Sequence, residues 1–174
     1  KNFSSGVKII PILDKRRRIK SIALEKSNAV EIGGKIISEK SPCFVIAEIG
    51  NNHNGDIILA KKLVNLAIES GADCVKFQMR NIKSLYKNEG NDSDQSADLG
   101  NQYTLDLLSR FQLNNKELFE VFDYCKQKGI TPLCTPWDLD SLYALEKYGL
   151  EAYKVASADL TNLELLEAIA KTEK

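Results

Sequence analysis

Residues 44–55 read FVIAEIGNNHNG, an apolar run that ends in glycine, asparagine and histidine. A continuous apolar run bounded by turn residues predicts a strand buried on both faces of a sheet. The run carries Glu48, and a carboxylate is costly to bury unless a charged or hydrogen-bonding group meets it. In α/β sheets, functional residues follow the carboxyl ends of the strands. The stretch therefore indicates either a functional sheet edge or a strand-to-helix turn whose Asn and Gly residues only supply backbone geometry.

Strands and helices alternate from residue 41 onward. Predicted strands cover residues 43–49, 74–79, 131–135 and 152–156, and predicted helices cover 56–70, 103–111, 115–128 and 163–170, with one more between Asp138 and Gly149. Asp56 is placed as an N-cap, and Asn114 with Glu117 forms a capping-box pattern. Four such units in a row imply a parallel sheet joined by crossover helices. The polar stretch 81–102 predicts a long loop, a length typical of lids and binding loops.

The first 40 residues have a different pattern. Residues 7–13 and 19–24 predict a β-hairpin, and the basic run 14–18 between them is interpreted as a solvated turn. Residues 29–32 and 35–38 predict a second hairpin around Gly33 and Gly34. We divide the chain into an N-terminal hairpin segment, residues 1–28, and an α/β domain, residues 29–174.

The composition excludes several classes of protein. The chain has 174 residues, zero formal net charge and 43% hydrophobic residues, which describes a globular protein with a substantial core. Neutral charge argues against a nucleic-acid partner, and no apolar run reaches the ~20 residues of a membrane span. The four cysteines show no C-x-x-C spacing, which favours a reducing, cytoplasmic setting. His53 is the single histidine, so this chain alone supplies no multi-histidine metal site.

Polar residues recur at the carboxyl ends of the predicted strands: Glu48, Lys76, Gln78, Thr135, Lys154 and Ser157. Strand alternation places Lys76 and Gln78 on the face opposite Val75 and Phe77. A lysine that points into a sheet's interior is costly without an anion to neutralise it. Either lysine alone is also explained by a structural salt bridge. Two lysines at equivalent strand ends favour a bound phosphate or carboxylate.

Four motifs carry a family resemblance. Residues 47–55 (AEIGNNHNG), 75–78 (VKFQ), 134–137 (CTPW) and 153–159 (YKVASAD) resemble the sialic acid synthase (N-acetylneuraminate synthase) family in order and spacing. The resemblance spans about residues 35–174. It implies an α/β fold: a partial (β/α)8 TIM barrel made of the first four β-α units and preceded by β-hairpins. We expect the other half of the barrel beyond Lys174, and no activity from residues 1–174 alone.

The resemblance also implies a reaction. Members of the family condense phosphoenolpyruvate with an N-acetylated hexosamine, N-acetylmannosamine or a relative, to form a nonulosonic acid and release phosphate. A divalent metal, Mn²⁺ or Mg²⁺, polarises the sugar aldehyde as a Lewis acid. Its histidine ligands are expected beyond Lys174, and His53 is interpreted as a hydrogen-bond partner that orders its own loop. The full-length protein is expected to be a homodimer.

Roles for individual residues follow from the same resemblance. Lys76, Thr135, Lys154 and Ser157 would hold the phosphoenolpyruvate, and Gln78 would contact the amino sugar. Glu48 would act at the aldehyde oxygen or on a metal-bound water, and Asp159 stands where the family also has Glu, so the reach of this catalytic carboxylate differs. Asn91 and Tyr103, in or beside the predicted loop, correspond to sugar contacts. The catalytic set is therefore Glu48, Lys76 and Asp159.

Three further interpretations stay open. Residues 6–24 resemble the closing hairpin of a CBS regulatory module, apart from Arg17 and Ser21 where that pattern usually has glycine, which implies an upstream nucleotide-sensing region. A different phosphoenolpyruvate–aldose synthase, such as one making a keto-deoxy sugar phosphate, is an alternative function, although the motif at residues 48–53 argues against it. A non-catalytic binding protein on a degenerate barrel is another, although the intact polar residues argue against it.

Overall fold

The computed structural model describes residues 7–13, 19–26, 29–82 and 107–174. By their internal contacts, the residues form two compact units, Lys1–Cys43 and Phe44–Lys174. The second predicted hairpin lies in the first of these units.

Both predicted hairpins are confirmed in the first unit. Strand β1 (Val7–Leu13) pairs antiparallel with β2 (Ile19–Lys26), and β3 (Val30–Ile32) pairs antiparallel with β4 (Lys35–Ile37). Gly33 and Gly34 connect the second pair with φ angles of 59° and 75°. Two successive positive φ angles match the twist of a tight two-residue hairpin turn, and glycine adopts them without strain. The basic run 14–18 lies outside the described residues.

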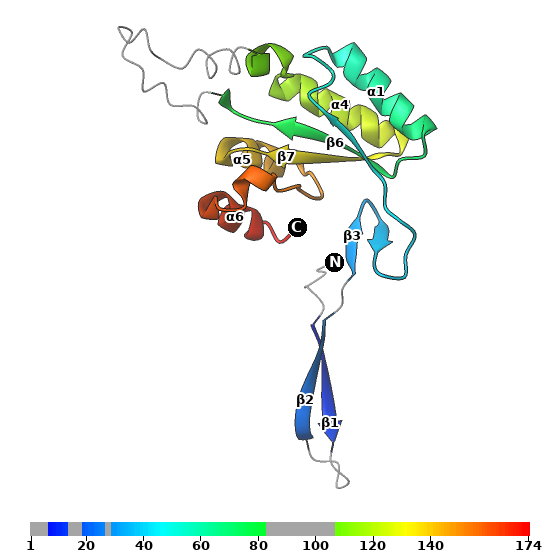
Figure 1. Cartoon of the computed structure of the whole chain (residues 1–174), viewed down its shortest axis with the longest axis vertical. Coiled ribbons are helices and arrows are strands. Elements are labelled where there is room, and N and C mark those ends of the chain that lie inside the picture. The colour runs from blue at the N-terminus through cyan, green and yellow to red at the C-terminus, as the bar shows by residue number, and fades with distance from the viewer. Residues whose placement is uncertain (1–6, 14–18, 27–28, 83–106) are drawn as a thin grey trace, which may run out of the picture. The chain divides into compact units, whose positions relative to one another are not determined.

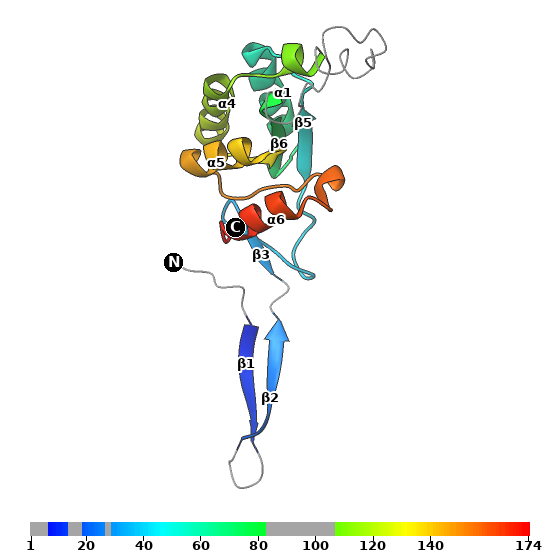
Figure 2. The same cartoon turned by 90° about the vertical axis from the view of Figure 1, so that its left-hand side faces the viewer.

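The second unit is an α/β fold around a parallel sheet, as predicted. The sheet has the order β5 (Ile46–Gly50), β6 (Cys74–Met79) and β7 (Thr131–Pro136). Helix α1 (Ile57–Glu69) follows β5, and α4 (Asn115–Lys128) precedes β7. Helices α5 (Leu139–Tyr148) and α6 (Leu163–Ala170) come after β7. In both cartoon views α1 and α4 lie side by side (Figures 1 and 2).

Local capping sets the ends of the helices. The Asp56 side chain accepts hydrogen bonds from two backbone N–H groups in the first turn of α1. At the start of α4 the Asn114 side chain accepts from the Glu117 N–H, and the Glu117 side chain accepts from the Asn114 N–H, so the predicted capping box is present. Gly129 ends α4 in the left-handed conformation that favours glycine. These reciprocal bonds satisfy backbone groups that a helix end leaves unpaired.

The apolar face of β6 forms the centre of the core. Val75 and Phe77 are fully buried, and the Phe77 ring lies 5.7 Å from the Phe122 ring of α4, centroid to centroid. Val64 of α1 is buried in the same cluster. Because alternate strand residues face opposite sides, this packing turns Lys76 and Gln78 toward the other face of the sheet, as predicted.

Two predicted strands differ from the structure. The first begins at Ile46 instead of residue 43 and is not buried on both faces, because Val45 and Ile46 remain 48% and 43% exposed. Within the described sheet β5 pairs with β6 alone, so its other edge carries no neighbour. The fourth predicted strand, residues 152–156, contracts to one parallel bridge between Cys134 and Tyr153, since no ladder extends it.

The structure describes only part of the predicted loop, residues 81–102, and of the predicted helix that follows it, residues 103–111. Residues 107–111 are helical, which agrees with the end of the helix predicted over 103–111. Residues 83–106, which contain most of the predicted loop, lie outside the described residues. No helix in the described ranges is long and apolar enough to cross a membrane.

Candidate active site

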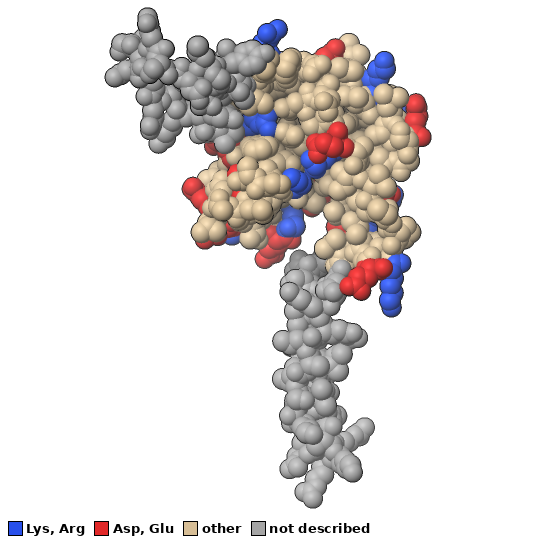
Figure 3. All heavy atoms as spheres, in the orientation of Figure 1, with Lys and Arg blue, Asp and Glu red and all other residues tan. Residues whose placement is uncertain are grey.

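The site begins with an ion pair between neighbouring strands. Glu48 of β5 and Lys76 of β6 are partners in the parallel register, and their side chains form a salt bridge. Lys76 is only 8% exposed, whereas the Glu48 side chain is 49% exposed. Figure 3 shows acidic and basic atoms in contact near the middle of this face of the second unit. The pair places a half-solvated carboxylate against a buried ammonium group.

A second lysine adds positive charge to the same region. Lys154 is anchored beside β7, where its backbone N–H donates to the Cys134 carbonyl at 3.0 Å. Burial lowers the pKa of Lys76, and the positive charge of Lys154 lowers that pKa further. Both effects disfavour the charged form of Lys76, and a bound anion would act against them by favouring that form. Lys76 therefore has a salt bridge within the protein, which is one of the two explanations that the sequence allowed for a buried lysine. A second cation, Lys154, also lies close to it.

Gln78 and Thr135 continue the polar face along the strands. They are register partners on β6 and β7, and Thr135 is only 2% exposed. The Gln78 side-chain oxygen accepts a hydrogen bond of 2.6 Å from the Arg80 guanidinium. Gly50, at the end of β5, leaves room for this face: a Cβ there would lie 3.1 Å from Glu48 Oε1 and 3.2 Å from Gln78 Nε2. The missing side chain thus lets two polar groups approach the same point.

Two further predicted residues lie in a short 3₁₀ turn, η1 (Ser157–Asp159), after the bridge at Tyr153. Ser157 is exposed and Asp159 is 9% exposed. Asp159 Oδ1 accepts from the Asn162 side chain at 3.3 Å, and Oδ2 is buried without a hydrogen-bond partner among the described residues. The contacts of Asp159 thus link it to the start of α6 and not to the Glu48–Lys76 pair. Asn91 and Tyr103 lie outside the described residues.

His53 orders its own loop, as interpreted from the sequence. It is 2% exposed and its ring lies 6.2 Å from that of Phe77, centroid to centroid. The Gly55 N–H donates to His53 Nδ1 at 3.1 Å. Burial lowers the pKa of His53, against the opposing effect of a backbone hydrogen bond with Gly50. This lowering of the pKa favours the neutral imidazole, whose Nδ1 acts as a structural acceptor for the Gly55 N–H.

The described residues do not supply a metal centre. Within residues 29–82 and 107–174, no three His, Cys, Asp or Glu side chains gather in a way that could hold an ion. The one half-exposed carboxylate of the site, Glu48, is already paired with Lys76.

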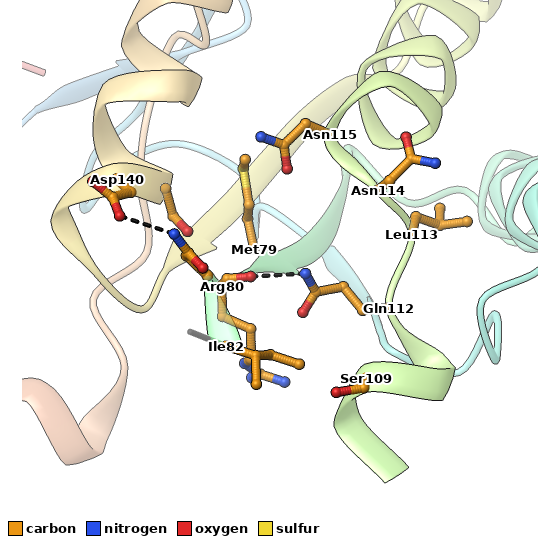
Figure 4. A pocket seen from close by; sticks show the side chains of 11 residues that line it. Met79, Arg80, Ile82, Ser109, Gln112, Leu113, Asn114, Asn115 and Asp140 are labelled. Atoms are coloured by element: carbon orange, nitrogen blue, oxygen red, sulfur yellow. Dashed lines mark hydrogen bonds between the residues drawn. The ribbon is translucent and has the colours of Figure 1, made fainter. Parts of the chain in front are cut away.

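A hollow of about 530 Å³ lies next to this site, at the carboxyl end of β6. Figure 4 shows it between the first turns of α4 and α5, with Met79, Asn115 and Asp140 on its walls. Its lining includes Arg80, which the sequence analysis missed because the predicted strand stopped at Met79. The alternation that selected Lys76 and Gln78 also selects Arg80, two residues further on.

Comparisons with known proteins agree on one family. Residues 63–174 match the sequence profile of the NeuB family. The chain is 37% identical to N,N'-diacetyllegionaminic acid synthase of Campylobacter jejuni over 133 residues, which is 75% of this chain and 40% of that protein. It is 31% identical to N-acetylneuraminate-9-phosphate synthase of Mus musculus over 140 residues, 79% of this chain and 39% of that protein.

A solved structure extends the similarity to the fold. The N-acetylneuraminic acid (sialic acid) synthetase of Leptospira borgpetersenii, crystallised in complex with citrate, superposes with a TM-score of 0.72 at 30% identity. The alignment covers 83% of this chain and 47% of that one. The chain thus spans about two fifths of the length of the curated relatives it matches.

Proposed function

Because the chain belongs to the NeuB family, we propose that the full-length protein condenses phosphoenolpyruvate with an N-acetylated hexosamine, forming a nonulosonic acid and releasing phosphate. The relatives named above are synthases of N,N'-diacetyllegionaminic acid and of N-acetylneuraminate 9-phosphate, which supports this class of product. The observation that carries the proposal is that the buried Lys76 of β6 has a second cation near it, Lys154, which follows the parallel bridge at Tyr153. Two cations so placed fit a substrate with a carboxylate and a phosphate.

The proposed roles of these residues are the ones that the family resemblance implies. Lys76 and Lys154 bind the anionic groups of phosphoenolpyruvate, and the hydroxyls of Thr135 and Ser157 add hydrogen bonds. Holding this substrate against the sugar turns a reaction between two molecules into an oriented reaction within one complex. The enol carbon attacks the aldehyde carbon, water adds to the carbon that carries the phosphate, and phosphate leaves. Fixed lysine charges stabilise the negative charge that develops on the departing phosphate.

In this proposal the Glu48 carboxylate and the Gln78 amide act on the sugar. Glu48 lies at the rim of the site, half exposed, where it reaches the aldehyde oxygen or an attacking water. Gln78 contacts the sugar with its amide nitrogen. Asp159 is the third residue of the proposed catalytic set, and its side chain accepts a hydrogen bond from Asn162.

The remaining parts of the proposal concern the whole protein. We place residues 29–174 as the first half of a (β/α)8 barrel, with the hairpin segment 1–28 as the tail of a CBS-like module. A divalent metal, Mn²⁺ or Mg²⁺, supplies Lewis-acid chemistry through ligands beyond Lys174, and the enzyme is a cytoplasmic homodimer. The parallel order β5-β6-β7 and the bridge at Tyr153 support the barrel, since they match its first strands in order.

Phosphate release is the test of this function. The full-length protein is assayed with phosphoenolpyruvate, Mn²⁺ and three acceptors in parallel: N-acetylmannosamine, its 6-phosphate and a diacetamido sugar. We expect release that depends on one sugar and falls at least ~100-fold in Lys76→Met, because a transition-state charge contact is lost. Lys62→Met on the exposed side of α1 is the matched control and should retain wild-type rates.

Three outcomes would contradict the proposal. Wild-type enzyme that releases no phosphate with any of the acceptors favours the non-catalytic binding protein. Release that occurs only with a fourth acceptor, a sugar phosphate without an acetamido group, favours the keto-deoxy sugar phosphate synthase. A Lys76→Met variant as active as Lys62→Met removes the buried lysine from the mechanism.

A further inference from the structure

Arg80 makes a buried contact with the amide of the proposed sugar-binding residue. It stands one position past β6, on the same face as Lys76 and Gln78, and it is only 7% exposed. Its guanidinium Nη2 donates to Gln78 Oε1 at 2.6 Å, and its guanidinium Cζ lies 4.7 Å from the centroid of the Trp137 ring. A short hydrogen bond from a cation is stronger than one between neutral groups, and a stacked ring holds a guanidinium plane in place.

The backbone around Arg80 is held as firmly as its side chain. The Gln112 side-chain N–H donates to the Arg80 carbonyl at 2.7 Å, a bond drawn in Figure 4. The Trp137 N–H donates to the Met79 carbonyl at 3.0 Å. Three elements, the end of β6, the segment before α4 and the segment before α5, thus fix the position of one guanidinium group.

This contact decides which way the Gln78 amide points. A glutamine amide has an acceptor oxygen and a donor nitrogen of nearly the same shape, so its orientation is set by its neighbours. Arginine has five donors and no acceptor, so the group that faces it must be Oε1. Gln78 Nε2 is then left on the side of Gly50, where a Cβ would lie 3.2 Å from it and 3.1 Å from Glu48 Oε1.

We infer that Arg80 is a positioning residue: it fixes the Gln78 amide so that its N–H donors face the acceptor sugar. The substrate group recognised by those donors is a neutral oxygen acceptor, the acetamido carbonyl or a hydroxyl. An amide free to rotate would offer the sugar an oxygen about as readily as a nitrogen, and would lose this discrimination. The inference rests on the proposed function, since it assigns a role within that site.

The test separates the two substrates by their Michaelis constants in the full-length enzyme. Arg80→Met removes every donor but keeps the apolar stem, and we expect the sugar KM to rise about tenfold with the phosphoenolpyruvate KM unchanged, as for loss of one charge-assisted hydrogen bond. Arg80→Lys keeps a cationic donor and should recover part of the loss. Arg110→Met, at an exposed position, is the matched control and should leave both constants unchanged.

A double substitution shows whether Arg80 acts through Gln78. In the background of Gln78→Ala, Arg80→Met should cause no additional rise in the sugar KM, because the amide that it orients is absent. Additive effects, or an Arg80→Met variant that raises both Michaelis constants together or neither, would overturn the inference while the proposed function stands. Wild-type enzyme without turnover on any acceptor would overturn the proposed function and the inference with it.

Discussion

Gly50 is the position where a single added methyl group tests the site most directly. Its φ angle is 54°, in the left-handed region that L side chains rarely adopt. A Cβ there would lie 3.1 Å from Glu48 Oε1 and 3.2 Å from Gln78 Nε2, closer than ordinary van der Waals contact. Gly50→Ala therefore combines backbone strain with displacement of two side chains that the proposal places at the sugar.

The two effects differ in size and in what they change. A left-handed backbone costs a non-glycine residue about 1–2 kcal/mol. Alanine also restricts the unfolded chain, which offsets about 0.4–1 kcal/mol of that cost. The net loss of folding free energy from the backbone is thus about 1 kcal/mol. Glu48 and Gln78 have flexible ends, so they move aside by a few tenths of an ångström, which disturbs substrate binding more than stability.

Gly71→Ala is the control that separates the effects. Gly71 follows α1 with a φ angle of 77°, and nothing lies within 4 Å of its Cβ position. Urea unfolding followed by far-ultraviolet circular dichroism should show a similar loss of about 1 kcal/mol for both variants. Only Gly50→Ala should raise the sugar KM, by about tenfold, because small misplacements of positioning groups are costly to catalysis.

Two results would refute this reasoning. Equal sugar KM values in Gly50→Ala and Gly71→Ala would show that the space beside Glu48 and Gln78 is not used by the substrate. An unchanged urea midpoint in Gly71→Ala would show that the left-handed backbone carries no measurable cost in this fold.

Two further predictions concern stability alone. Burial lowers the pKa of His53, so the unfolded state binds the proton first, and stability should fall as the pH drops below the ordinary value of 6.5 and through the folded pKa. Between about pH 7.5 and about pH 5.5, the urea midpoint should fall more for wild type than for His53→Asn. The asparagine keeps an acceptor for the Gly55 N–H but does not titrate. Equal falls in the two proteins would contradict the lowered pKa of His53. Asn114→Ala should lower the free energy of unfolding in urea by about 1 kcal/mol, because it breaks the reciprocal hydrogen bonds with Glu117. The same change at Asn115, one residue further on, should lower it much less. Equal losses in the two variants would contradict the capping role of Asn114.

Helix limits and the central strand followed from the sequence because their causes are local. The predicted helix 115–128 matches α4 residue for residue, since Asn114 and Glu117 bond to each other's backbone and Gly129 adopts a left-handed conformation. The predicted strand 74–79 likewise matches β6, whose apolar residues are buried and bounded by polar ones. The same alternation predicted correctly which face carries Lys76 and Gln78.

The predictions that failed depend on partners far away in the chain. Residues 43–45 are predicted as strand, yet β5 starts at Ile46 because its neighbour β6 begins at Cys74, the register partner of Ile46. Residues 152–156 have the composition of a strand, yet only Tyr153 bridges to Cys134. A strand exists through its ladder, so its length is set by neighbours and not by its own residues.

The sequence by itself predicted the candidate polar residues, the strand face that carries Lys76 and Gln78, and the family whose motifs these residues form. Only the tertiary structure decided how they are paired: the parallel register sets Lys76 against Glu48 and Gln78 beside Thr135, and the loop after β7 brings Trp137 beneath Arg80. Composition and spacing act along the chain, whereas register and burial arise between segments that are distant in it. For that reason the sequence predicted the polar residues of this site. The fold determines which of them form an ion pair, which are buried, and which side chain orients another.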